Sequence, residues 1–147
     1  MTTSDIGLLD TNVLVYAADE ASPFHHAATA LRDKGFRGET PVCVCPQVLH
    51  EFFAVITDPK RVTNPLGQKD AQKEIEKYFY SKHIVKIFPE PEVMEKMFNL
   101  LTRYKVAAQE IFDLRLVATM ISNNVSRLYT YNTEDFAQYK EIEVVTP

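Results

Sequence analysis

Four acidic residues stand where an α/β protein gathers its ligands. Asp10, Glu51, Asp113 and Asp135 each follow a strand-like run or lie in the helix that comes next. In open α/β sheets ligands bind at the carboxyl ends of the strands, so we expect these carboxylates to meet at one edge. Like charges that share a site raise each other's pKa, so the group needs a counter-charge to stay ionised.

The ligand types indicate which counter-charge fits. Carboxylate oxygens with no accompanying cysteine or histidine cluster favour hard cations, Mg²⁺ or Mn²⁺. Two such ions about 4 Å apart can activate a water molecule and stabilise the leaving oxygen during phosphodiester hydrolysis. The acids therefore predict a metal site and metal-assisted hydrolysis.

Asp10 and Glu51 stand out against apolar neighbours. Asp10 interrupts the run LLDTNVLVY, and an isolated buried carboxylate costs several kcal/mol unless it has a partner. Glu51 lies in PQVLHEFFAVI, where Gln47 is its only polar neighbour three or four positions away. We expect that helix to be buried, with Glu51 directed at a site.

Asp113 and Asp135 each have a simpler alternative explanation. Asp113 opens the helix FDLRLVATMI, and an acid in a first turn stabilises a helix through the helix dipole alone. Asp135 lies in TYNTEDF, which also reads as an ordinary polar turn capped by Asn132 and Thr133. The case for a site rests on the four acids together.

Strand-like and helix-like segments alternate along the chain. We predict strands over 6–9, 42–45, 83–88, 127–131 and 142–145, and helices over 13–18, 22–35, 46–56, 68–81, 91–104 and 111–123. Such alternation implies right-handed crossovers and a mainly parallel sheet covered on both faces. The predicted class is α/β, with a single domain over residues 1–147.

Composition narrows the class of protein further. The chain has 147 residues, of which 46% are hydrophobic and 24% charged, as in globular proteins. No apolar run approaches the roughly 18 residues that cross a bilayer, and MTTSDIG is not a secretory signal, so we expect no membrane association and a cytoplasmic protein. Cys43 and Cys45 are interpreted as small core residues in a reducing compartment.

Charge is distributed unevenly although the net charge is only −4. Residues 60–105 hold ten lysines or arginines against six acids, and the rest of the chain holds six against fourteen. This pattern suits a basic face beside an acidic centre that acts on a polyanion, but on charge alone solvated helix faces are the favoured explanation. Arg61, Arg103 and Arg115 are candidates for contacts with the phosphates of such a polyanion.

Several segments together carry a family resemblance. LLDTNVL, the helix with Glu51, IFDLRLVAT and TYNTEDF occur in this order, and the chain ends in VVTP. With the central PKRVTNPL, this set resembles the PIN-domain ribonucleases, and most closely the VapC-like toxins of bacterial toxin–antitoxin pairs. The resemblance spans nearly the whole chain.

The resemblance implies a three-layer α/β/α fold around a short, mainly parallel sheet, and Mg²⁺- or Mn²⁺-dependent endonucleolytic cleavage of RNA. It also implies a homodimer and an inhibitory antitoxin protein as partners. By position, Asp10, Glu51 and Asp113 would be the core catalytic and metal-binding carboxylates, with Asp135 as the fourth. Supporting residues that orient ligands or water would be Thr11, Asn12, Thr130 and Asn132.

Two positions depart from the family pattern. Many members have aspartate where this chain has Asn132, which makes Asp135 the candidate for the fourth acid and leaves the second metal ion in question. The segment AAQEIF before Asp113 lacks a glycine often found there and adds Glu110.

Three other functions fit less well. An aspartate-dependent phosphatase also begins with an acid after its first strand, but it usually needs a second acid two residues on, where this chain has Asn12. A receiver domain would need a lysine after a late strand, and Thr130-Tyr131-Asn132 offers none. A catalytically silent PIN-like domain that only binds RNA or protein remains the main alternative, disfavoured by the complete set of acids.

Overall fold

The strands form one parallel sheet at the centre of the molecule. The computed structural model describes residues 5–147. Its sheet has the order β3-β2-β1-β4-β5, and all four neighbouring pairs are parallel. The strands are β1 (Gly7–Leu9), β2 (Val42–Val44), β3 (Val85–Lys86), β4 (Arg127–Tyr129) and β5 (Glu143–Val145).

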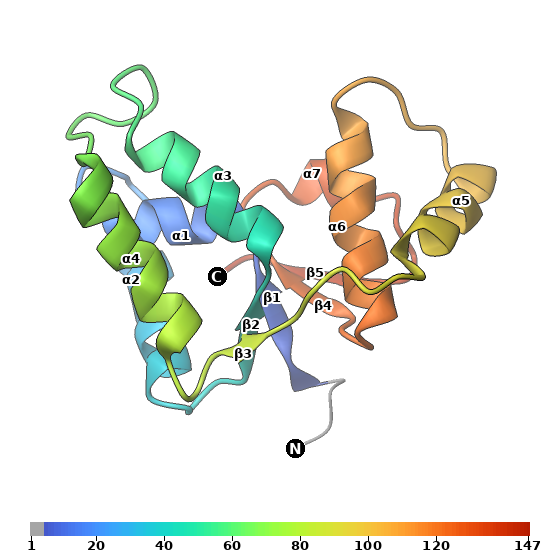
Figure 1. Ribbon diagram of the computed structural model, residues 1–147, viewed down its shortest axis with the longest axis horizontal. Coiled ribbons are helices and arrows are strands. Elements are labelled where there is room, and N and C mark those ends of the chain that lie inside the picture. The colour runs from blue at the N-terminus through green and yellow to red at the C-terminus, as the bar shows by residue number, and fades with distance from the viewer. Residues whose placement is uncertain (1–4) are drawn as a thin grey trace.

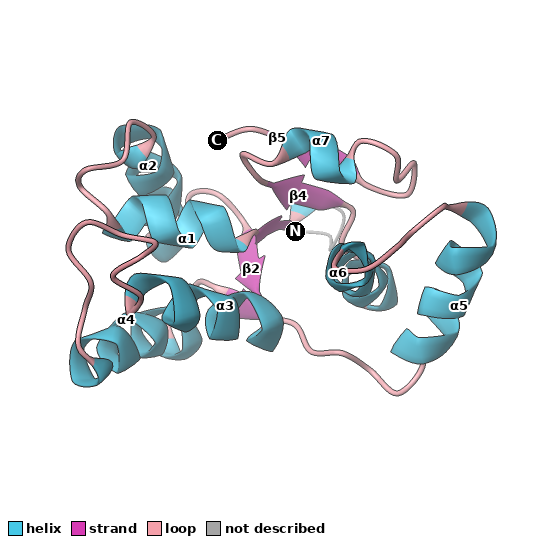
Figure 2. Cartoon of the chain, turned by 90° about the horizontal axis from the view of Figure 1, so that it is seen from above, coloured by secondary structure: helices cyan, strands magenta, loops and turns pink. Residues whose placement is uncertain are grey.

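Helices cover the sheet on both sides and make two lobes. The helices are α1 (Thr11–Ala18), α2 (His25–Phe36), α3 (Pro46–Ile56), α4 (Gln68–Tyr80), α5 (Val93–Arg103), α6 (Glu110–Ser122) and α7 (Thr133–Phe136). Figure 1 and the view from above in Figure 2 place α1 to α4 on one side of the sheet and α5 and α6 on the other. The predicted three-layer α/β/α class is confirmed.

The helices that follow β1 and β2 begin at signals that are visible in the sequence. The side chain of Asp10 caps α1 by accepting a hydrogen bond from the backbone N–H of Thr11. Pro46 occupies the first turn of α3, where its missing N–H has no helical partner to lose. Because both helices start at the carboxyl edge of the sheet, their first turns surround the same region.

Apolar side chains from the strands and the inner helix faces form one core. Leu8, Leu9 and Leu128 are fully buried in the central strands, and Phe52 and Leu114 are buried from α3 and α6. Cys43 and Cys45 are buried and free, as predicted for small core residues. None of the helices within residues 5–147 is long and apolar enough to cross a membrane.

Several element boundaries differ from the predictions. Ser22 and Pro23 belong to turns that precede α2, because Ser22 Oγ accepts from the N–H of Phe24 and the backbone N–H of Ser22 donates to Asp19. The predicted strand over 83–88 shortens to the two residues of β3. The segment around Asp135, for which a polar turn was the alternative explanation, forms the short helix α7.

Gly35 was predicted to end the second helix but instead permits close packing. The helix continues to Phe36, and a Cβ on Gly35 would lie 2.6 Å from Cγ2 of Val42 in β2. Gly38, with a φ of +74°, provides the left-handed conformation that follows the helix end.

Candidate active site

The four predicted acids all project from the carboxyl edge of the sheet. Asp10 follows β1 directly, and Glu51 lies in α3, the helix after β2. Asp113 lies in the first turn of α6, and Asp135 lies in α7, which follows β4. Strand topology therefore brings together residues that are up to 125 positions apart in the sequence.

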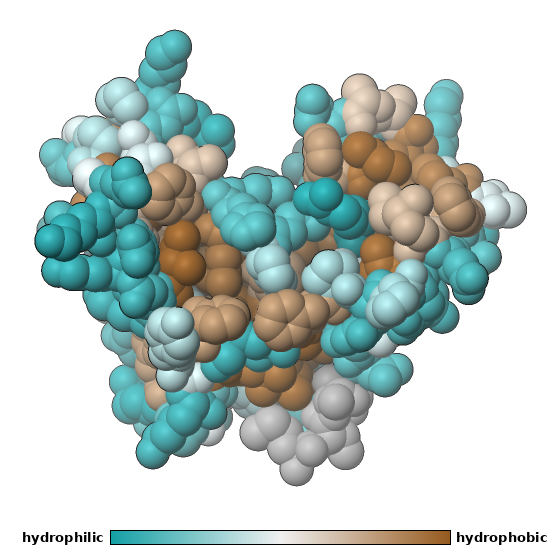
Figure 3. Space-filling model, viewed as in Figure 1, coloured by the Kyte–Doolittle hydropathy of each residue, from teal (hydrophilic) through white to brown (hydrophobic). Residues whose placement is uncertain are grey.

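A polar cleft of about 570 Å³ opens at this edge. Asp10, Glu51 and Asp113 line it, and Asp135 does not. In Figure 3 the surface is hollowed between the two lobes, and hydrophilic residues gather in the hollow. The full lining consists of Asp10, Thr11, Asn12, Val15, Tyr16, Glu51, Ala54, Val55, Arg61, Asp113 and Asn132.

Asp10 is buried at the centre of a hydrogen-bond network. Its Oδ1 accepts from the backbone N–H of Thr11 at 2.8 Å, and its Oδ2 accepts from the hydroxyl of Thr130 at 2.8 Å. The amide of Asn12 donates to the same Oδ2 at 3.3 Å and to Thr130 Oγ1 at 3.0 Å. Burial raises the pKa of Asp10, and the hydrogen bonds from Thr130 and Thr11 oppose that rise.

The supporting residues lock two neighbouring loops together. Asn12 Oδ1 accepts from the backbone N–H of Tyr131 at 3.0 Å, and Thr130 Oγ1 accepts from the backbone N–H of Asn132 at 3.0 Å. The first turn of α1 is thereby tied to the segment that follows β4. This arrangement orients Asp10 within a fixed frame.

Glu51 faces the cleft from an exposed side of its helix. Thr11 donates its hydroxyl to Glu51 Oε2 at 2.9 Å, and Gln47 donates its amide to Oε1 at 3.3 Å. The expectation that the whole helix is buried was wrong, since α3 buries only the face with Val48, Leu49, Phe52 and Ile56. Glu51 has few polar neighbours in the sequence because the opposite face of α3 is apolar, and Glu51 itself is not buried.

Asp113 titrates well above the ordinary range for aspartate. Partial burial is the main cause, and the negative charges of Asp10, Asp135 and Glu51 add to it, so that its pKa rises to about 6. Glu110, whose role the sequence left open, contributes least to this rise and accepts a hydrogen bond from the backbone N–H of Ala107. The four acids therefore interact electrostatically across the cleft.

The chemistry of the donors fits a hard divalent cation, although the carboxylates do not converge on one point. Within residues 5–147, no three histidine, cysteine, aspartate or glutamate side chains stand close enough to share an ion. The acids nevertheless offer only oxygen ligands, and burial, with a smaller contribution from their mutual repulsion, raises the pKa of Asp10 and Asp113. A cation among them would relieve that repulsion.

Gln47 and Arg115 are site residues that the sequence did not assign to the acid network. Gln47 donates to Glu51 Oε1 and to the carbonyl oxygen of Phe112, while Arg115 Nε donates to Gln47 Oε1 at 3.0 Å. This chain connects α3 to α6, the two helices that carry Glu51 and Asp113. The one available signal was that Gln47 lies four positions before Glu51, on the same helix face.

The three arginines proposed for phosphate contacts lie in different surroundings. Arg61 lines the cleft and is exposed. Arg115 is held by Gln47 and lies over the ring of Phe112, 5.2 Å from its centroid. Arg103 pairs with Glu141 at 2.6 Å and does not line the cleft. Of the three, Arg61 is placed best to meet a phosphate beside the acids.

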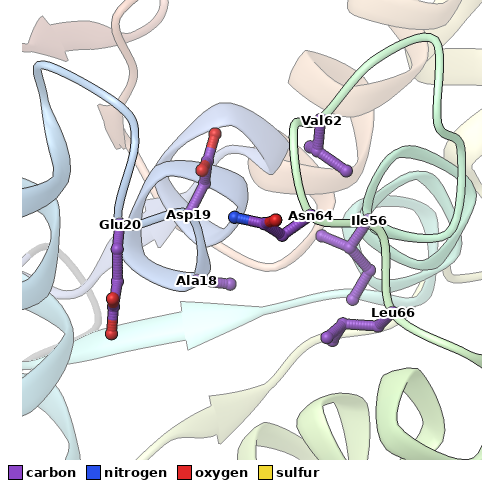
Figure 4. A pocket seen from close by; sticks show the side chains of 7 residues that line it. All are labelled: Ala18, Asp19, Glu20, Ile56, Val62, Asn64 and Leu66. Atoms are coloured by element: carbon purple, nitrogen blue, oxygen red, sulfur yellow. The ribbon is translucent and has the colours of Figure 1, made fainter.

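A second hollow of about 200 Å³ lies beyond the end of α1. Ile56, Val62 and Leu66 form its apolar side, and Figure 4 shows the amide of Asn64 pointing toward the end of α1. Asp19 and Glu20 are its acidic residues, and no arginine or lysine lines it. The polar cleft has three acids and an arginine in its lining, and it therefore remains the candidate active site.

We expect Thr130→Val to destabilise the protein by about 1–3 kcal/mol, because Asp10 Oδ2, Asn12 and the N–H of Asn132 all lose a buried partner. The pKa of Asp10 should rise further, since a hydrogen bond that lowers it is removed. Urea unfolding at pH 7 and an NMR titration of the Asp10 carboxyl carbon measure both effects. Thr130→Ser keeps the hydroxyl and should restore both values; unchanged values in Thr130→Val would contradict the network.

Comparisons with known proteins point to one family. Residues 7–142 match the family model described as PIN domain. Ribonuclease VapC24 of Mycobacterium tuberculosis is 29% identical over 131 residues, which cover 89% of each chain.

Solved structures show the same fold at lower identity. The crystal structure of VapC20 from Mycobacterium tuberculosis, a Sarcin-Ricin loop cleaving toxin, superposes with a TM-score of 0.66 at 16% identity, over 93% of this chain and 98% of that one. A toxin–antitoxin complex from Klebsiella pneumoniae contains a chain that superposes with a TM-score of 0.61 at 21% identity, over 96% of this chain and 97% of that one.

Proposed function

The chain belongs to the PIN-domain family, and from this premise we propose that it is a divalent-metal-dependent endoribonuclease, the toxin of a toxin–antitoxin pair. The observation that carries the proposal is the cleft shared by Asp10, Glu51 and Asp113, where burial and then the neighbouring negative charges raise the pKa of Asp113 to about 6. Such perturbed carboxylates mark a site built for a cation rather than for fold stability. The name of the similar ribonuclease VapC24 supports RNA as the substrate.

Asp10, Glu51, Asp113 and Asp135 would hold the metal ion, Mg²⁺ or Mn²⁺. A divalent cation at this site supplies an activated water and neutralises charge that develops on the phosphate. Asp10 is already oriented by Thr11, Asn12 and Thr130, whereas the exposed Glu51 and half-buried Asp113 have freedom to turn toward it. Asp135 adds negative charge beside the cleft, as its effects on Asp10 and Asp113 indicate.

Other residues of the cleft would position the RNA. Arg61 offers an exposed guanidinium, which forms paired hydrogen bonds with phosphate oxygens. Asn132 presents an amide at the same rim, where a further carboxylate would repel the RNA backbone. The segment that contains Arg61 would thus hold a phosphate near the acids.

The proposal extends to partners and location. The chain would act as a single domain in the cytoplasm, form a homodimer and be inhibited by a cognate antitoxin. The toxin–antitoxin complex among the structures of the same fold supports the antitoxin. A small open reading frame beside this one in the genome would encode that partner.

Incubation of the purified protein with total bacterial RNA tests the proposal. With Mn²⁺ or Mg²⁺ we expect discrete fragments on a denaturing gel, no cleavage in EDTA, and recovery when Mn²⁺ is added in excess of the chelator. Cleavage that persists in EDTA would contradict the metal requirement. RNA that binds but stays intact with every metal would instead identify a catalytically silent binding domain.

A further inference from the structure

Three aromatic rings pack together beside the cleft, where the half-buried Tyr16 and Tyr131 rest against the core and Phe24 is exposed. The ring centroids of Phe24 and Tyr131 are 4.6 Å apart, with the rings tilted by 33°. Tyr16 completes the group, at 5.2 Å from Phe24 and 5.3 Å from Tyr131. We call these three residues the aromatic platform.

The platform is joined directly to the proposed active site. Tyr16 lines the cleft together with Asp10 and Arg61. Tyr131 follows Thr130, the residue that donates to Asp10, and its backbone N–H donates to Asn12. A nucleotide whose phosphate reached Arg61 and the acids would therefore lie next to these rings.

The platform is poorly suited to a purely structural role. Phe24, the residue before α2, is 44% exposed. A ring that is left this exposed stabilises the fold less than a buried ring would. The hydroxyl of Tyr131 is buried and has no hydrogen-bond partner in the part of the chain that the structure describes. Tyr16 and Tyr131 thus support the ring of Phe24 from the core side, and the exposed ring of Phe24 beside the polar cleft is available to a ligand.

We propose that the aromatic platform stacks an unpaired base of the RNA next to the phosphate that is cleaved. Bases present flat π-faces that stack on aromatic side chains, and only unpaired bases can leave their own helix to do so. The platform thus selects single-stranded RNA or loops over continuous duplex. This inference rests on the proposed ribonuclease function and adds the residues that seat a base beside the cleaved phosphate.

A fluorescence experiment tests stacking without relying on cleavage. The chain contains no tryptophan, so Phe24→Trp places a single indole on the platform. In an Asp10→Asn background, which keeps the RNA intact, an eight-nucleotide oligouridylate or oligoadenylate should quench this indole at least twofold. A blunt RNA duplex should leave it unchanged.

The matched control is Phe98, which is 57% exposed on α5 and lines no part of the cleft. The anisotropy of a 5′-fluorescein-labelled oligonucleotide first gives the concentration that saturates binding. At that concentration of unlabelled oligonucleotide, the indole of Phe98→Trp in the same background should not be quenched. Equal responses of the two indoles, or no binding of either oligonucleotide, would overturn the proposal.

Kinetics separates this inference from the proposed function. Phe24→Leu keeps an apolar side chain but loses the π-face, so KM for a single-stranded substrate should rise about tenfold with kcat within about twofold. Phe24→Tyr should restore the wild-type KM, and Phe98→Leu should not change it. A wild-type KM in Phe24→Leu overturns the platform alone, whereas absence of cleavage by the wild type, with quenching retained, overturns the ribonuclease function alone.

Discussion

Asp10→Asn should abolish RNA cleavage, with a loss of more than about a hundredfold in kcat/KM. Removal of a residue that merely orients a metal ligand costs about 10–100-fold, and Asp10 is itself the best oriented candidate ligand. The asparagine side chain has an N–H₂ group in place of one carboxylate oxygen. If this group takes the place of Oδ2, it meets the donors of Thr130 and Asn12, so the substitution removes the charge and also disturbs these hydrogen bonds. Initial rates on a fluorophore–quencher RNA with saturating Mn²⁺ measure the effect.

Loss of activity in Asp10→Asn should not reflect unfolding. Burial disfavours the charged form of Asp10, so an uncharged side chain removes that penalty and offsets part of the cost of the lost hydrogen bonds. We expect Tm at pH 7 to stay within about 5 °C of the wild type. Asp70→Asn, in an exposed first turn of α4, is the matched control and should keep full activity. Wild-type cleavage by Asp10→Asn would remove Asp10 from the mechanism.

Asp113→Asn should reduce cleavage to a similar extent, mainly through weaker metal binding. Asp113 and Asp10 line the same cleft, and replacement of one acid removes both a ligand and part of the field that attracts a cation. The apparent Mn²⁺ requirement of any residual activity should therefore rise at least tenfold. An unchanged requirement would show that Asp113 only stabilises the first turn of α6.

The raised pKa of Asp113 also predicts the acid side of the pH profile. Below about pH 6 the carboxyl takes up a proton and loses its affinity for cations, so at subsaturating Mn²⁺ kcat/KM should fall as the pH is lowered through 6. Saturating Mn²⁺ competes with the proton and should move this limb to lower pH. If the pH at which kcat/KM falls does not depend on the Mn²⁺ concentration, the fall is caused by the titration of a group other than Asp113.

Stability should show the opposite dependence on pH when EDTA is present. A carboxyl whose pKa is raised in the folded state contributes stability that is fully present below its ordinary pKa, 3.8, and is lost as the pH rises through about 6. Tm should therefore increase when the pH is lowered from 7.5 to 5. The increase should be smaller in Asp113→Asn, and an equal increase would contradict the assignment.

Much of the architecture was predictable because local signals and topology agree. Pro46 begins α3 where the sequence indicates, and α1 begins at Thr11, two residues before the predicted start at Val13, because Asp10 caps it. Alternating strands and helices leave a parallel sheet as the simplest solution, and that sheet fixes which loops share an edge. The grouping of Asp10, Glu51 and Asp113 at the cleft follows from that rule.

The remaining features depend on tertiary contacts that leave no periodic trace. The link from Gln47 to Arg115 joins residues 68 positions apart, and neither residue type is unusual on a helix. The platform brings Phe24 against Tyr131 across more than a hundred residues. Hydrophobicity alone assigns such rings to a core, and only the exposure of Phe24 and the position of Tyr16 in the cleft beside Asp10 suggest another role.

Calorimetric titration of Mn²⁺ into the wild type and Asp10→Asn, at pH 7.5 and without RNA, tests most directly whether these acids form a cation site. We expect saturable binding to the wild type and at least a tenfold weaker affinity for Asp10→Asn, with Asp70→Asn indistinguishable from the wild type. Equal affinities for the wild type and Asp10→Asn, or no binding to the wild type, would contradict a metal centre in the cleft.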